Sequence, residues 1–154
     1  MSNSVSPTCG KALTVKKIFS RQTTVTIDIS APPEAVWKLL TDAEGFASWN
    51  STIVELTGKI APGERIQLRS TLAPGRTFKL KVKEFKPYER LSWGDAMGTR
   101  VYTLTPCPNG ETRFMMSEKI GGPVFPLFAR LIPPFDESFN QFAADLKSAA
   151  EENH

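Results

Sequence analysis

Glu118 is the acidic residue of this sequence whose neighbours best suit a chemical role. It follows Phe114 and Met116 at alternate positions of one predicted strand. Because side chains along a strand point to opposite faces in turn, Glu118 shares a face with these two apolar residues. A carboxylate held among apolar groups can bind a ligand hydroxyl group or act as an acid. The alternative is a strand-end carboxylate that reaches water or pairs with a nearby Arg or Lys.

Other groups that could take part in catalysis are few. The sole histidine is His154, at the end of the chain, which argues against histidine-based catalysis and a multi-histidine metal site. Cys9 and Cys107 have no metal-ligand spacing, and we expect them to be free thiols in a reducing compartment. Asp95 lies in a glycine-flanked stretch that is either a hinge over a cavity mouth or a plain turn. We expect no metal and no cofactor.

The length of 154 residues predicts one domain. Nineteen basic and 16 acidic residues give a formal charge of +3, too small to indicate a nucleic-acid partner. No apolar run approaches the roughly 20 residues of a membrane span, and the start lacks an apolar signal region, so we expect a cytoplasmic protein. Residues 1–20 show no periodicity and predict a flexible N-terminal arm before a domain at 21–154. The oligomeric state stays open.

The last third of the chain predicts a long helix with one aromatic face. Its apolar residues fall three or four positions apart, at Phe135, Phe139, Phe142, Leu146 and Ala149 or Ala150. The remaining positions are mostly polar, so the apolar stripe must pack on another part of the chain.

An apolar segment precedes this helix, from residue 123 to 132, and Pro133 and Pro134 must break or kink it. We expect its apolar side chains to be buried against the sheet. The alternative is a surface that touches a membrane or a partner, which leaves a transient membrane contact open. The residues concerned are Phe125, Leu127, Phe128, Leu131 and Ile132.

Most of the chain before residue 120 alternates with a period near two, which is typical of half-buried strands. Pro32-Pro33-Glu34 predicts the start of a short helix, and Thr41-Asp42-Ala43-Glu44 predicts a capping box for a second helix through Trp49. Asn109-Gly110 predicts a two-residue type I′ hairpin turn. The seven expected strands are 22–30, 51–58, 64–72, 76–86, 89–95, 99–106 and 111–119.

The faces of these strands can be sorted by alternation. Ile66 and Leu68 alternate with polar residues, and Phe78, Leu80 and Val82 alternate with lysines. One sheet face is therefore apolar. The expected fold is α+β, with a seven-stranded curved antiparallel sheet wrapped around the long C-terminal helix and two short helices after the first strand.

Several short motifs are similar to those of a known superfamily. They are Ala31-Pro32-Pro33-Glu34-Ala35-Val36-Trp37, Trp49-Asn50, Leu91-Ser92-Trp93-Gly94, Asn109-Gly110-Glu111-Thr112 with Glu118, and Gly121-Gly122-Pro123. From about residue 20 to the end, the chain resembles the START-like superfamily of polyketide cyclases, dehydrases and lipid transport proteins. The resemblance implies a helix-grip fold whose sheet and long helix enclose a cavity for lipids, polyketides or other apolar molecules.

Two functions follow as hypotheses from this resemblance. The first is a noncatalytic protein that binds or carries a small hydrophobic ligand; the second is a cyclase, aromatase or dehydratase in which Glu118, Asp95 or Tyr102 moves a proton. For each apolar candidate the plain alternative is core packing. The candidate ligand-binding residues are Trp49, Leu68, Phe78, Trp93, Phe114, Met116, Glu118, Phe135 and Phe139.

Overall fold

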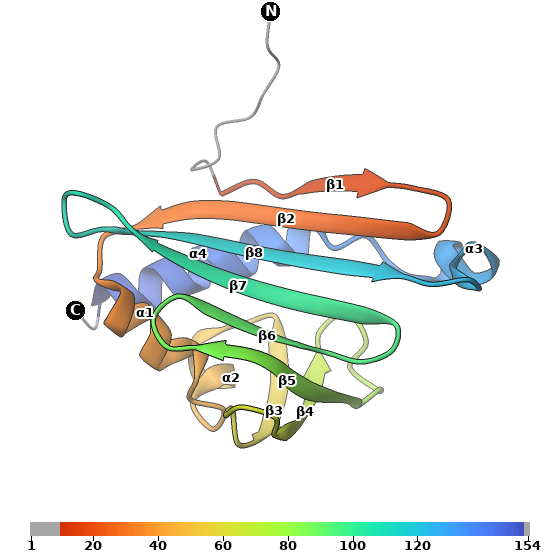
Figure 1. The fold of residues 1–154 in the computed structure, drawn as a ribbon, viewed down its shortest axis with the longest axis horizontal. Coiled ribbons are helices and arrows are strands. Elements are labelled where there is room, and N and C mark those ends of the chain that lie inside the picture. Colours follow the sequence, from red (N-terminus) through yellow and green to blue (C-terminus); the bar gives the residue numbers. More distant parts are fainter. Residues whose placement is uncertain (1–9, 153–154) are drawn as a thin grey trace, which may run out of the picture.

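A single antiparallel sheet and the C-terminal helix dominate the computed structural model, which describes residues 10–152 (Figure 1). The sheet has eight strands in the order β1-β2-β8-β7-β6-β5-β4-β3. The strands are β1 Leu13–Lys16, β2 Ser20–Ile29, β3 Ile53–Gly58, β4 Arg65–Ser70, β5 Phe78–Lys86, β6 Arg90–Gly94, β7 Gly98–Pro106 and β8 Thr112–Gly121. The helices are α1 Pro33–Leu40, α2 Phe46–Trp49, α3 Phe125–Phe128, the 3-10 helix η1 Ala129–Leu131 and α4 Asp136–Glu152.

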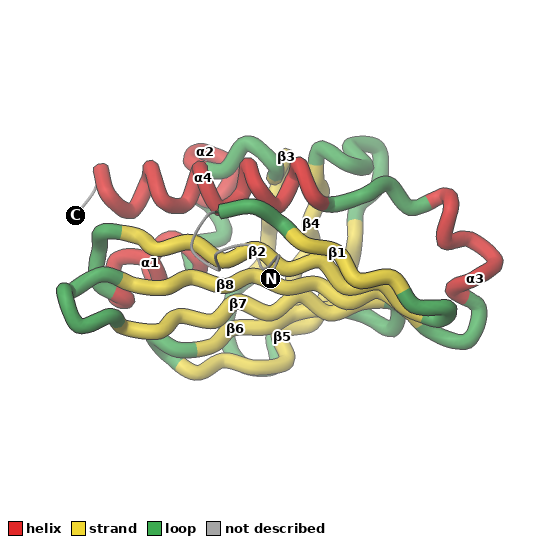
Figure 2. Tube along the Cα trace, turned by 90° about the horizontal axis from the view of Figure 1, so that it is seen from above, coloured by secondary structure: helices red, strands yellow, loops and turns green. Residues whose placement is uncertain are grey.

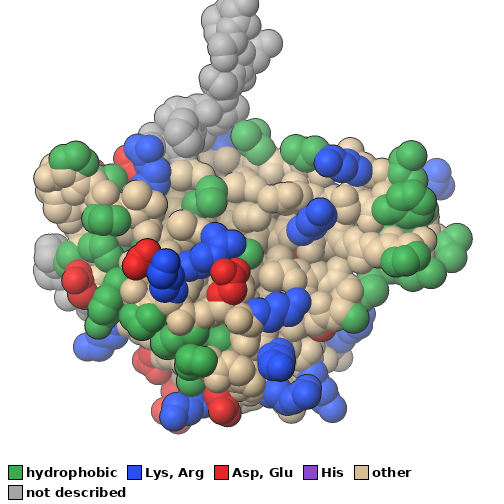
Figure 3. Space-filling model, viewed as in Figure 1, with side chains coloured by type: hydrophobic (Ala, Val, Ile, Leu, Met, Phe, Trp, Pro, Cys, Tyr) green, Lys and Arg blue, Asp and Glu red, His purple; other side chains and the backbone are tan. Residues whose placement is uncertain are grey.

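Helix α4 lies along one face of the sheet, here called the inner face (Figure 2). The predicted aromatic stripe is confirmed, because Phe139, Phe142 and Leu146 are all buried. The acidic residues Asp136 and Glu137 occupy the first turn, where they suit the helix dipole. The outer face carries many of the Lys and Arg side chains (Figure 3). No helix between residues 10 and 152 has the length and apolar character needed to cross a membrane.

The sheet has eight strands rather than the seven expected, because part of the predicted N-terminal arm is a strand. β1 pairs antiparallel with β2, with Leu13 opposite Thr24. Two hydrogen bonds tie this edge to α4: Ala12 N donates to Asn140 Oδ1 at 2.6 Å, and Thr14 Oγ1 donates to Asp136 Oδ1 at 2.8 Å. The rest of the predicted arm, residues 1–9, lies outside the described residues.

The predicted capping box is wrong. The Thr41 hydroxyl group donates backwards to the carbonyl oxygen of Trp37 at 2.8 Å, so it serves the end of α1 instead of the start of α2. α2 begins only at Phe46, after Gly45, and has no side-chain cap. The short α2 is held by packing, since Phe46 is fully buried.

The predicted type I′ turn is also wrong. Such a turn needs a positive φ at both central residues, and of the pair only Gly110 has one, at 84°. Cys107 N instead donates to Glu111 O at 2.8 Å, and Gly110 N donates to Cys107 O at 3.2 Å. The hairpin therefore closes through a longer turn with a single left-handed glycine.

The segment before α4 differs most from expectation. Phe125 is buried, as predicted, with 3% of its surface exposed. Leu127 and Leu131 are 84% and 82% exposed, so the predicted burial is wrong for these two residues. The reason is local: α3 and η1 are single turns, and each can bury only one side.

Candidate ligand-binding site

The middle of the inner face is filled by aromatic rings. Phe142 of α4 lies with its ring centroid 5.7 Å from that of Tyr102 on β7 and 6.3 Å from that of Phe114 on β8. Phe46 and Trp49 approach the same ring from α2, each at 5.9 Å. These distances are those of packed aromatic pairs, so side chains occupy this part of the interior.

Towards the N-terminal end of α4, the inner face carries an ion pair. Arg100 and Glu118 lie directly opposite each other on β7 and β8. Arg100 Nε donates to Glu118 Oε1 at 2.7 Å, and the two side chains are only 16% and 20% exposed. The sequence left open whether Glu118 pairs with a nearby cation, and Arg100 is that cation.

The guanidinium group of Arg100 also lies over the aromatic stripe of α4. Its carbon atom is 5.1 Å from the ring centroid of Phe139 and 5.8 Å from that of Phe142. Burial lowers the pKa of Arg100, but the charge of Glu118 and the neighbouring Tyr102 more than offset this, so the pKa lies above its ordinary value. Within the described residues, the hydrogen bond of standard geometry from this guanidinium group is the one from Nε to Glu118, and Tyr102 interacts with the same group. A guanidinium group has five N–H donors and a carboxylate has two acceptor oxygens, so the pair has hydrogen-bonding capacity beyond this one bond.

Tyr102 adds a buried hydroxyl group beside this pair. Its side chain is 1% exposed, and the hydroxyl oxygen makes no hydrogen bond of standard geometry within the described residues. Burial raises the pKa of Tyr102 to about 12, and the charge of Glu118 adds to this rise while Arg100 opposes it. The hydroxyl group therefore stays neutral across the physiological range and can donate a hydrogen bond.

Titration of Tyr102 is a direct check on this environment. The folded pKa of about 12 exceeds the ordinary value of 10.0, so the fold favours the neutral phenol. This preference for the neutral phenol stabilises the folded protein fully below pH 10. The stabilisation is lost as the pH rises through about 12. The ultraviolet difference between the protein and its Tyr102→Phe variant is expected to show phenolate only near the upper value. Ionisation near the ordinary value would mean that water reaches the hydroxyl group.

Arg21 supplies a second cation at the same end of the sheet. Its guanidinium group donates to the carbonyl oxygens of Ile132 and Pro133, at 3.2 and 2.8 Å, and lies 5.0 Å from the ring centroid of Phe135. Burial lowers the pKa of Arg21, and the charges of Asp136 and Glu118 partly offset this effect. Arg21 therefore holds the segment that leads into α4.

The structure brings several predicted site residues together and separates others. Phe135 and Phe139 stack with ring centroids 5.8 Å apart, beside the pair formed by Glu118. Phe78 is farther along the sheet, under the guanidinium group of Arg76 at 4.5 Å. Asp95 closes a turn by accepting hydrogen bonds from two backbone N–H groups. The buried members of the predicted set are Leu68, Trp93, Phe114, Met116 and Phe139.

Sequence reasoning missed both arginines of this region. Arg100 lies two and four residues before the buried Tyr102 and Leu104. Arg21 likewise lies two and four residues before Thr23 and Val25. The period of two therefore places both arginines on the inner face. That signal was present in the sequence. A charged residue next to buried alternating positions is normally taken as a strand end, which is why the arginines were not singled out.

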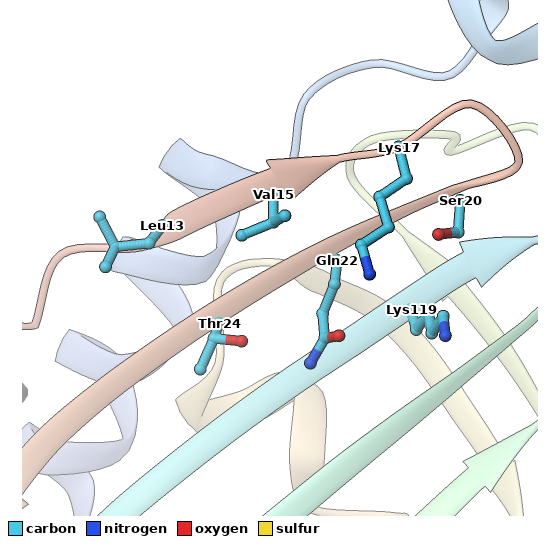
Figure 4. A pocket seen from close by; sticks show the side chains of 7 residues that line it. All are labelled: Leu13, Val15, Lys17, Ser20, Gln22, Thr24 and Lys119. Atoms are coloured by element: carbon cyan, nitrogen blue, oxygen red, sulfur yellow. The ribbon is translucent and has the colours of Figure 1, made fainter.

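Two hollows stand out in the described part of the chain, and neither lies between the sheet and α4. One, of about 320 Å³, is lined by residues of β1 and β2 and their surroundings, including Leu13, Val15 and Lys119 (Figure 4). The other, of about 520 Å³, adjoins it and includes Asp95 and Lys119. Around Phe142, the space between the sheet and α4 is occupied by the packed rings of Phe46, Tyr102 and Phe114.

A curved antiparallel sheet that holds a long C-terminal helix is the START-like helix-grip fold. Several solved structures have a similar fold. A protein from Nitrosomonas europaea has a TM-score of 0.69 at 17% identity, with 90% of this chain and 98% of that chain covered. A Mesorhizobium loti protein has a TM-score of 0.64 at 24% identity, with 85% and 98% covered. A START superfamily protein from Mycobacterium smegmatis has a TM-score of 0.64 at 14% identity, with 86% and 99% covered.

These identities establish the fold alone, and no curated protein matches the sequence. A family model decides the membership. The model described as polyketide cyclase / dehydrase and lipid transport matches residues 20–151. The chain belongs to this family.

Proposed function

We propose that this protein binds a small apolar molecule with one oxygen-bearing head group, between the inner face of the sheet and the first turns of α4. The observation that carries the proposal is the Arg100–Glu118 pair, held on the inner face against the ring of Phe139. Membership in a family that includes lipid transport proteins supports a hydrophobic guest.

The Arg100–Glu118 pair is better explained as a binding site for a polar head group than as a source of stability. A buried ion pair is often no more stabilising than apolar side chains of similar volume, because both charges lose their hydration. Among residues 10–152, it leaves N–H donors of Arg100 and one carboxylate oxygen of Glu118 without hydrogen bonds of standard geometry. A carboxylate or carbonyl group would accept from the first, and a hydroxyl group would donate to the second.

Entry of the ligand requires side chains to move. Phe135 is only half buried and lies in the link between η1 and α4, held by the two hydrogen bonds from Arg21 to Ile132 and Pro133. Displacing the Phe135 ring would uncover Phe139 and the ion pair. The flat rings then offer apolar area to the ligand chain at low entropic cost.

The test is a binding titration with fluorescent probes that share a chain and differ in head group, namely a fatty acid, a fatty alcohol and a headless hydrocarbon. We expect saturable binding of the first two and weaker binding of the hydrocarbon. Glu118→Gln and Arg100→Gln are each expected to weaken probe binding about tenfold or more, as for loss of hydrogen bonds to charged groups.

A matched control exists on the outer face. Arg113 and Asp28 are also directly opposite each other on neighbouring strands, with Nε and Oδ1 at 2.9 Å. Asp28→Asn and Arg113→Gln are expected to leave probe binding unchanged. Absence of saturable binding, or equal losses from inner and outer variants, would contradict the proposal.

A second candidate is a cyclase-like or dehydratase-like enzyme that uses the same site, and one observation favours it. The neutral hydroxyl group of Tyr102 is buried beside Arg100, where it can donate a hydrogen bond or a proton to a polarised carbonyl group. Turnover of a polyketide-like or acyl substrate that is lost in Tyr102→Phe, with probe binding retained, would promote this candidate over simple binding.

A further inference from the structure

One end of the molecule carries a group of exposed apolar side chains, here called the apolar tip. It consists of Ile18, Phe19, Val124, Leu127 and Leu131, with exposed fractions of 75%, 57%, 52%, 84% and 82%. In Figure 3, hydrophobic side chains gather over this end, where Figure 1 places α3.

Two segments far apart in the sequence form the apolar tip together. Ser20 at the start of β2 lies opposite Gly121 at the end of β8, and Gly122 N donates to Phe19 O at 3.0 Å. The turn between β1 and β2 therefore lies beside α3. Inside the second segment, Phe125 is buried and its ring lies 6.0 Å from that of Phe128, which leaves Leu127 on the open side of α3.

Basic residues surround the apolar tip. Residues 11–27 contain four Lys or Arg and no Asp or Glu, and residues 119–135 contain two Lys or Arg and no Asp or Glu. Of these cations, Lys16, Lys17, Lys119 and Arg130 are exposed. The two outer-face hollows next to the tip are lined by Lys17, Lys83 and Lys119.

Three acidic groups near this end are already engaged, whereas Glu137 in the first turn of α4 is exposed. The Asp95 carboxylate accepts hydrogen bonds from the N–H groups of Met97 and Gly98 in the turn between β6 and β7. Glu118 is paired with Arg100, and Asp136 accepts a hydrogen bond from Thr14. The four exposed cations Lys16, Lys17, Lys119 and Arg130 thus outnumber this exposed carboxylate.

We propose that the apolar tip inserts into a membrane surface that contains anionic phospholipid, with the surrounding basic residues at the level of the phosphate groups. Protruding Leu, Ile and Phe side chains next to Lys and Arg are the combination that an interface of acyl chains and anionic head groups binds. A second copy of the same surface would bring like charges together, which disfavours dimerisation through the tip. This inference does not rest on the proposed ligand.

Flotation with liposomes tests it. We expect the protein to float with vesicles of phosphatidylcholine and phosphatidylglycerol, and much less with phosphatidylcholine alone. The neutral double variant Leu127→Gln/Leu131→Gln is expected to lower partitioning about tenfold or more, because two apolar side chains no longer leave water. Its matched control is Val54→Gln/Met115→Gln, at two residues outside the tip that are each 37% exposed.

A second pair of variants tests how much the basic residues contribute to membrane binding. Lys16→Gln/Lys17→Gln is expected to lower partitioning into anionic vesicles by more than about tenfold, since each basic residue near such a surface contributes roughly fivefold. Lys38→Gln/Lys59→Gln removes the same charge elsewhere on the exposed surface and is expected to change little.

Three results would overturn the inference: no flotation with anionic vesicles, equal losses in tip and control variants, or a dimer that Leu127→Gln/Leu131→Gln dissociates while vesicles stay unbound. Circular dichroism of each variant verifies folding. Tip variants are expected to keep probe binding, so failure here and failure of the ligand proposal are distinguishable.

Discussion

Replacement of Glu118 by Ala is expected to lower the free energy of unfolding by about 3 kcal/mol, because it leaves a mostly buried guanidinium group without its partner. Arg100 is only 16% exposed and lies over Phe139, so water cannot easily replace the lost carboxylate. Urea denaturation followed by circular dichroism measures the change.

The double variant Arg100→Met/Glu118→Leu separates stability from function. Both charges are removed together, so we expect stability close to that of the unchanged protein, while head-group-dependent probe binding is lost. Asp28→Ala, which breaks the exposed outer-face pair with Arg113, is expected to have a much smaller effect than Glu118→Ala. If Glu118→Ala were equally mild, the inner pair would be solvated and could not serve as a buried anchor.

Replacement of Phe142 by Ala is expected to lower the free energy of unfolding by about 4 kcal/mol, as for other fully buried Phe residues. The side chain is 1% exposed and has ring contacts to residues of α2, β7 and β8. For a domain of this size the loss corresponds to a fall in Tm of roughly 10 °C, measured by calorimetry.

Phe78→Ala is the comparison for this variant, because Phe78 is half buried and lies outside the aromatic cluster. We expect a clearly smaller fall in Tm. Equal falls would mean that Phe142 borders open space, and the site would then extend along the whole inner face.

The period of the sequence predicted much of the fold. Phe139, Phe142 and Leu146 were placed correctly because their spacing has one helical solution, and Phe114 and Met116 because alternation fixes a strand face. β1 was not predicted from the sequence. Its apolar residues Leu13 and Val15 are exposed, so burial does not hold this strand in place. Pairing with β2 and contacts to α4 hold it instead.

The candidate site was less accessible to prediction. Glu118 was identified, but its partner Arg100 depends on the register between β7 and β8, which a single sequence does not give. The filling of the interior depends on how rings from four elements meet around Phe142, and periodicity carries no information about that. The exposure of Leu127 likewise depends on where α3 turns.

Hydrogen exchange with and without a saturating fatty-acid probe tests the central claim most directly. The account predicts slower exchange of backbone amides in the segment from Phe135 to Phe142 and in the strands that carry Arg100 and Glu118. Saturable binding with slower exchange confined to β1 and β2, beside the outer-face hollow lined by Leu13 and Lys119, would contradict it.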